Sequence, residues 1–163
     1  MVLGEPPDRP VDYRRPMRRI QRSAQIDAPP ARVYAFLSDP TNLPLWQTGV
    51  ISSERTSPPP TVAGSTGRAV FEVMGQQVTA ETTVREAVPD RRLVVASSVA
   101  GMSVVGSLDL VAADGGTRVT FSSEVKAESI FMAPLERLIA DAAEKELDPS
   151  LARLRIALGA VPE

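Results

Sequence analysis

The sequence predicts one α+β domain in which a curved antiparallel sheet of about seven strands wraps around a long C-terminal helix. Three observations support this architecture. Between residues 67 and 127, segments of alternating apolar and polar residues follow one another with short turns between them. Residues 131–158 carry leucines at helical spacing. Two short, proline-bounded helical stretches follow the first strand. A chain of 163 residues is long enough to bury a core and is typical of a single domain.

The N-terminal segment, residues 1–17, contains four prolines and no periodic apolar face, so we expect an irregular tail. Five arginines between residues 14 and 22 make the junction basic. A solvated arm is the favoured interpretation, and a patch for anionic lipid or phosphate is the alternative. The domain is then expected over residues 18–158, followed by a C-terminal tail over residues 159–163. Its first strand covers residues 18–27, where alternation places Ile20, Arg22, Ala24 and Ile26 on one face.

Two short helices are predicted within residues 26–50. Asp27 is expected to cap the first, because the two prolines that follow Ala28 have the backbone geometry of a first helical turn. This helix ends before Pro40, since the residue preceding a proline avoids the α conformation. The second short helix covers residues 42–46 and ends at Gly49.

The remaining strands are predicted from alternation and turn chemistry. One strand covers residues 49–56, and a stiff proline-rich loop then leads to residue 67. From there the chain predicts a meander whose turns lie at Gly75-Gln76, Pro89-Asp90, near Gly101 and at Asp114-Gly115-Gly116. In the strand after the first of these turns, one face is formed by Val78, Ala80, Thr82 and Val84.

The final helix carries an apolar stripe that begins with Phe131, Leu135, Leu138, Ile139 and Ala142. Pro149 lies inside this pattern, and we expect a kink near Glu146 because proline removes a backbone hydrogen bond.

Missing residue types exclude several kinds of chemistry. The chain has no cysteine and no histidine, which removes disulfides, thiolate nucleophiles and imidazole bases. No phosphate loop or dinucleotide fingerprint is present, and we expect neither a metal ion nor a cofactor. The net charge of −2 argues against nucleic acid as a partner. No apolar run has the length of a membrane span and no signal-peptide core is visible, so no stable membrane insertion and a cytoplasmic location are expected.

A long helix lying across a curved sheet leaves an apolar cavity between them, which is the usual form of a small-molecule site. Trp46, at the end of the second short helix, is predicted either to line this cavity or to plug the core. Plain core packing is the alternative for each of the other candidates. The predicted lining residues are Trp46, Phe71, Val73, Leu108, Leu110, Val119, Phe121, Leu135, Leu138, Ile139 and Ala142.

Several segments together resemble the polyketide cyclase/dehydrase and lipid-transport family. They are residues 26–46, IDAPPARVYAFLSDPTNLPLW, then VREAVPDRRL at 84–93, and GGTRVT at 115–120. The resemblance covers about residues 18–158 and implies the helix-grip fold of the START-like (SRPBCC) superfamily. That family includes carriers as well as cyclases and dehydratases, so the resemblance implies a fold and not one chemistry.

The sequence therefore leaves two candidate functions. The first is binding of a small hydrophobic molecule, such as a lipid, polyketide or aromatic compound, by a monomer or homodimer. The second is a cyclase or dehydratase that uses carboxylate, arginine or water; no catalytic residue can be assigned. Glu72, Glu81, Arg68 and Arg85 are its first candidates, and solvent exposure is the alternative for both glutamates. A third interpretation, an interaction module with a filled core, predicts no pocket of about 300 Å3.

Overall fold

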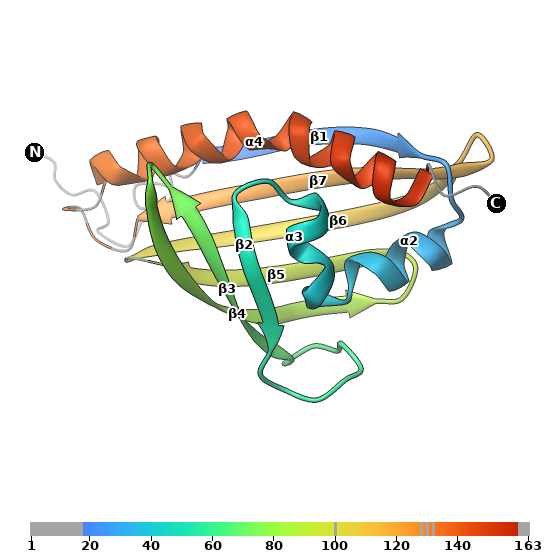
Figure 1. Ribbon diagram of the computed structural model, residues 1–163, viewed down its shortest axis with the longest axis horizontal. Helices are drawn as coiled ribbons and strands as arrows, with labels where there is room; N and C mark the ends of the chain where they lie inside the picture. Colours follow the sequence, from blue (N-terminus) through green and yellow to red (C-terminus); the bar gives the residue numbers. More distant parts are fainter. Residues whose placement is uncertain (1–17, 100, 128, 130, 132, 160–163) are drawn as a thin grey trace, which may run out of the picture.

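The computed structural model describes residues 18–99, 101–127, 129, 131 and 133–159 (Figure 1). The predicted tail over residues 1–17 lies outside the described residues, and so do residues 160–163 of the predicted C-terminal tail. In chain order the elements are β1 (Arg18–Ile26), α2 (Pro30–Leu37), the 3-10 turn η1 (Pro40–Asn42), α3 (Leu43–Trp46), β2 (Val50–Arg55), β3 (Thr66–Val73), β4 (Gln76–Val88), β5 (Arg92–Val99), β6 (Met102–Ala113), β7 (Gly116–Ala127) and α4 (Ala133–Gly159).

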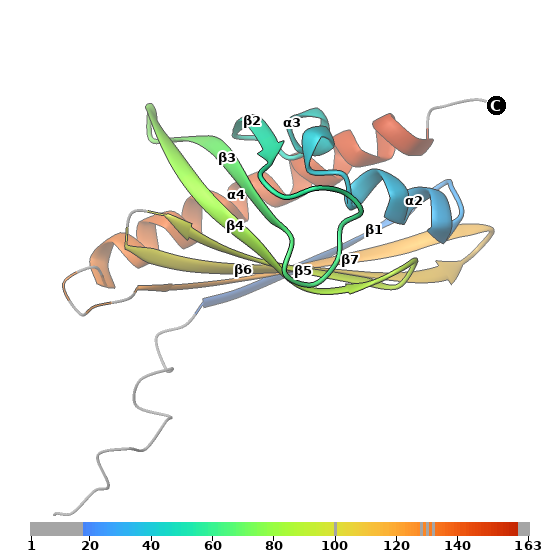
Figure 2. The same cartoon turned by 90° about the horizontal axis from the view of Figure 1, so that it is seen from below.

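The seven described strands form one antiparallel sheet in the order β1-β7-β6-β5-β4-β3-β2. Strands β2 to β7 are neighbours in sequence order, as the short turns predicted, and β1 pairs with β7 at one edge. Figure 2 shows that the sheet curves and that the helices lie together on its concave side. The predicted α+β class and the long C-terminal helix over a curved sheet are confirmed.

The turns between strands follow from backbone geometry. Asp114 and Gly115 have φ angles of 50° and 81°, the paired positive values of a type I′ hairpin turn, as predicted there. The turn predicted at Gly75-Gln76 is wrong by one residue. Met74 and Gly75 are its central residues, with φ angles of 50° and 80°, so glycine takes the second position. The hairpin type is therefore I′ and not the glycine-first type.

The helix α2 also differs from the prediction at its start. Pro29 is the N-cap residue and no side chain caps the helix, so the cap predicted at Asp27 is wrong. Pro29 has an extended backbone, with φ −70° and ψ 155°, and Pro30 takes the first helical position, so the helix starts two residues later than predicted. The helix α4 runs through Pro149 as one element, and the kink near Glu146 stays a prediction.

The core is divided along α4. A large cluster beneath the C-terminal half of this helix includes Ile26, Val33, Leu151 and Leu154. A small cluster lies beneath its N-terminal half, around Met102, Val125 and Ala140. In this arrangement α4 packs on β1 and β7, at one edge of the sheet, and also contacts α3. The α4 backbone lies further from the other strands than from β1 and β7. Among the described residues, no helix combines the length and apolar character needed to cross a membrane.

Candidate ligand-binding site

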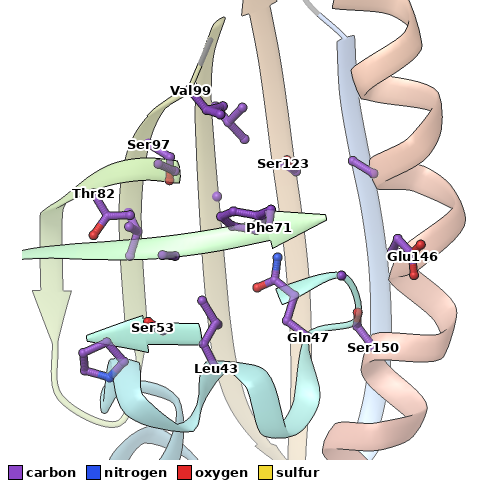
Figure 3. A pocket seen from close by; sticks show the side chains of 18 of the residues that line it. Leu43, Gln47, Ser53, Phe71, Thr82, Ser97, Val99, Ser123, Glu146 and Ser150 are labelled. Atoms are coloured by element: carbon purple, nitrogen blue, oxygen red, sulfur yellow. The ribbon is translucent and has the colours of Figure 1, made fainter. Parts of the chain in front are cut away.

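A cavity of about 590 Å3 lies between the concave face of the sheet, α3 and α4 (Figure 3). Strands β2 to β7 supply one wall, and the middle of α4 supplies another, through residues such as Ile139, Ala143 and Leu147. The volume exceeds about 300 Å3, which is near the lower end of typical ligand sites. The filled core that the interaction-module interpretation predicted is therefore wrong for this protein.

Eight of the eleven residues proposed from the sequence lie on the cavity wall. The sheet and α3 contribute five of them, and α4 contributes three. They are Trp46, Phe71, Val73, Leu108, Phe121, Leu135, Ile139 and Ala142. Whether any of them touches a ligand stays a prediction.

Three proposed residues lie elsewhere. Leu110 and Val119 are 5% and 0% exposed and belong to the large core cluster, together with α2 residues and the C-terminal part of α4. They share a sheet face with Leu108, but they are further along the strands, where the core is filled. Leu138 is 51% exposed, because it lies on the side of α4 that turns away from the sheet. These three predictions are wrong for reasons of position along a strand or rotation of a helix.

Trp46 forms part of the cavity wall and part of the core at once. Its side chain is 2% exposed and meets Phe121 edge to face, with ring centroids 6.1 Å apart and an interplanar angle of 74°. This is a favoured geometry for an aromatic pair. The indole is therefore held in a fixed orientation at the cavity, and both interpretations weighed for Trp46 apply.

The link between α3 and β2, residues 47–49, is fastened to α4. The Thr48 backbone N–H donates to Ser150 Oγ at 2.9 Å. The Thr48 hydroxyl lies 3.2 Å from Ser150 Oγ and 3.3 Å from the Glu146 carbonyl oxygen, and it also contacts the Glu146 carboxylate. Gly49, with a φ angle of 88°, then turns the chain into β2. These contacts join the α3–β2 link to α4 at the cavity wall.

Most charged groups proposed from the sequence face away from the cavity. Arg68 donates to Glu81 at 3.0 Å and to Glu54 at 3.1 Å, and all three side chains are exposed on the other face of the sheet. The hydrogen bond to Glu81, more than any other contact, raises the pKa of the Arg68 guanidinium. Arg85 is exposed, and Glu72 is exposed at the cavity edge. The arrangement brings none of these four side chains into an acid–base pair inside the cavity.

Sequence reasoning missed the polar part of the wall. Gln47 from the α3–β2 link and several hydroxyl residues of the sheet line the cavity, among them Ser53, Thr82, Ser97 and Ser123. Two signals were available. Thr82 shares a strand face with Val78, Ala80 and Val84, and Ser123 shares one with Phe121 and Val125, and all of these residues line the cavity. Alternation gave no such signal for Gln47, Ser53 and Ser97.

Solved structures with similar folds share little sequence with this chain. TTHA0849 from Thermus thermophilus is 23% identical, with a TM-score of 0.70 over 85% of this chain and 94% of that one. The Zhui aromatase/cyclase from Streptomyces sp. R1128 is 14% identical, with a TM-score of 0.73 over 90% and 99% of the two chains. A START superfamily protein from Mycobacterium smegmatis is 13% identical, with a TM-score of 0.71 over 88% and 99%. At these identities the likeness shows the helix-grip fold alone.

Comparison with curated proteins gives no significant match. The family model described as polyketide cyclase/dehydrase and lipid transport matches residues 17–159, which is nearly the whole described domain. The chain therefore belongs to the polyketide cyclase/dehydrase and lipid-transport family.

Proposed function

We propose that the protein binds a small hydrophobic molecule in the cavity between the sheet and α4. The observation that carries this proposal is the cavity itself, about 590 Å3 with predominantly apolar walls. Small-molecule sites commonly have volumes of about 300–1,000 Å3 and a mainly apolar lining with a few polar groups. A lipid, a polyketide or a polycyclic aromatic compound has the corresponding size and polarity.

A second candidate is a cyclase or dehydratase that acts on a polyketide-like substrate. Its support is the group of polar side chains on the wall, together with the fold shared with the Zhui aromatase/cyclase. General acid–base catalysis needs an ionisable group within reach of the substrate. The charged residues of the described wall are Arg55 on β2, Glu72 at the exposed edge of β3 and Glu146 on α4, and no two of them form an ion pair with each other in the described part of the chain. Simple binding is therefore the better-supported function.

The test uses the single tryptophan as a probe of the cavity. Pyrene accepts excitation energy from indole, so pyrene bound in the cavity quenches the emission of Trp46. We expect saturable quenching and a higher melting temperature in the presence of pyrene, because a ligand of the folded state stabilises it. No quenching and no stabilisation, across pyrene and a panel of fatty alcohols and polyketide-like phenols, would overturn the proposal.

Two substitutions on α4 locate the binding site. Ala142→Phe places a benzyl group at the cavity wall, whereas Ala152→Phe places the same group on an exposed position of the helix. The first is expected to weaken pyrene binding at least about tenfold, and the second to leave it unchanged. Ala143→Phe is a second cavity variant if the first does not fold. Equal effects of the cavity and surface variants would place the site elsewhere.

Turnover separates the two candidate functions. Incubation with a poly-β-keto thioester mimic, followed by mass spectrometry, is expected to return the mimic unchanged. Dehydration or cyclisation of the mimic at a rate above the buffer control would favour the enzyme, provided that Ala142→Phe abolishes this activity.

A further inference from the structure

Five uncharged polar side chains of the cavity wall that are buried or half-buried make no hydrogen bond within the described part of the chain. They are Gln47, Ser53, Thr82, Ser97 and Ser123. Polar groups in folded proteins are usually paired when they are removed from bulk water, so unpaired ones on a cavity wall are available to a bound molecule. Thr82 and Ser97 are directly opposite each other on β4 and β5.

Gln47 differs from the other polar residues of its own segment. In the stretch from η1 to β2, Asp39 accepts from Thr41, and Asn42 donates to the Phe36 carbonyl oxygen at 3.0 Å. Thr48 bonds to Ser150. The Gln47 side chain has no such structural partner among the described residues, and Figure 3 shows it extending from the link into the cavity. Its amide offers two donors and one acceptor.

The backbone of Gln47 is nevertheless held firmly. Its N–H donates to the Leu43 carbonyl oxygen at 2.9 Å, which ends α3. On one side the chain is fixed by Trp46, which is packed against Phe121, and on the other by the bond from Thr48 to α4. A polar group on a fixed backbone binds a ligand with little loss of conformational entropy.

The charges at the wall argue against an ionised ligand group at this position. Arg55 donates to Thr61 Oγ1 at 3.0 Å, and Thr61 in turn donates to the Ser38 carbonyl oxygen. Glu146 contacts Thr48, and Glu72 is at the exposed edge. Arg55, however, lies at the far end of β2 from Gln47, about 16 Å along the strand. A ligand carboxylate beside Gln47 therefore has no cation of the described wall nearby, and an unpaired charge in an apolar site is strongly disfavoured.

We propose that Gln47 is a specificity-determining residue that selects uncharged ligands with a carbonyl or hydroxyl group facing the α3–β2 link. This inference rests on the proposed function, because it concerns the same cavity. The apolar walls hold the hydrocarbon part, and the Gln47 amide bonds to the oxygen. Hydroxyls of the sheet, such as those of Thr82 and Ser97, are available to further oxygens of the same ligand.

The test measures the affinity of pyrene, 1-hydroxypyrene and 1-pyrenecarboxylate at neutral pH through quenching of Trp46. Gln47→Met keeps the length of the side chain and removes its hydrogen-bonding groups, and Gln47→Leu is a second version. Gln77→Met is the matched control, because Gln77 is exposed and does not line the cavity. Melting temperatures verify that each variant is folded.

In the native protein 1-hydroxypyrene is expected to bind more tightly than pyrene, and 1-pyrenecarboxylate more weakly than both. Gln47→Met should weaken 1-hydroxypyrene binding by about 2- to 10-fold, the range of one neutral hydrogen bond, with pyrene unchanged. The Gln77→Met control should show the native pattern. Equal losses for pyrene and 1-hydroxypyrene, no loss for either, or tightest binding of the carboxylate would overturn the role of Gln47 while leaving the proposed function intact. Absence of binding by all three probes would overturn both.

Discussion

Ser150 gives the sharpest test of how the α3–β2 link is held against α4. Its side chain is 1% exposed, and its Oγ accepts the Thr48 backbone N–H at 2.9 Å. Ser150→Ala removes this acceptor and leaves the N–H without a partner. An unpaired buried donor costs about 1–3 kcal/mol, and we take about 2 kcal/mol. Alanine has the higher helix propensity and offsets about 0.5 kcal/mol of this. The free energy of unfolding should therefore fall by about 1.5 kcal/mol.

For a domain of this size, about 1 kcal/mol corresponds to about 2–4 °C in melting temperature, so Ser150→Ala should melt about 3–6 °C below the native protein. Urea unfolding followed by Trp46 emission measures the free energy directly, since the indole lies one residue from the link. A double-mutant cycle with Thr48→Val should show coupling of about 0.5–2 kcal/mol, because the two side chains share one hydrogen-bond group. Ser98→Ala is the control, because Ser98 is exposed and its side chain makes no hydrogen bond to another described residue. If Ser150→Ala unfolds within about 0.5 kcal/mol of the native protein, as a surface substitution does, the link is not held by this bond.

Two further predictions concern positions outside the cavity. A methyl group at Gly116 would overlap the Ile26 carbonyl oxygen and lie 3.2 Å from Nε2 of Gln25. Gly116→Ala should therefore lower the free energy of unfolding, measured by urea unfolding, by about 1–3 kcal/mol or more. A loss below about 0.5 kcal/mol would show that the hairpin moves freely away from β1. Burial, and to a smaller degree the charge of Asp90, raises the pKa of Tyr34 above its usual value near 10. The folded state thus favours the neutral phenol, and this stabilisation is complete below the unfolded pKa and is lost as pH rises through the folded pKa. The Tyr34 hydroxyl is buried without a partner among the described residues. Tyr34→Phe should therefore be as stable as the native protein, or up to about 1 kcal/mol more stable, at neutral pH, and should lose less stability above pH 10. An equal loss of stability above pH 10 in both proteins would show that Tyr34 is not the group whose ionisation causes it.

The fold could be predicted because its signals are local and repeated. Alternation places a strand's apolar residues on one face, and Asp114-Gly115 fits the positive φ angles of its hairpin turn. The one-residue error at Gly75 shows the limit of turn chemistry. Met74 adopts a positive φ angle that its residue type does not predict, because the strands on both sides fix the register.

The site could be predicted only in part, because periodicity gives a face and not a position along it. Leu108 and Leu110 share one face of β6, yet only Leu108 is at the cavity, since the core is filled at the far end of the strand. On α4, Leu135 and Leu138 belong to one apolar stripe, and the rotation of the helix exposes Leu138. Gln47 belongs to no periodic pattern, because it is a single residue at the end of a helix. The direction of its side chain can be seen only in the three-dimensional structure.

A crystal structure of the protein grown with pyrene would show whether the cavity holds a ligand. We expect the ring system to lie between the concave face of the sheet and α4, in contact with Trp46 and with the apolar residues of both walls. A structure in which α4 closes onto β3 to β5 with no space beneath it, or in which pyrene binds at any other surface, would refute a ligand site in this cavity.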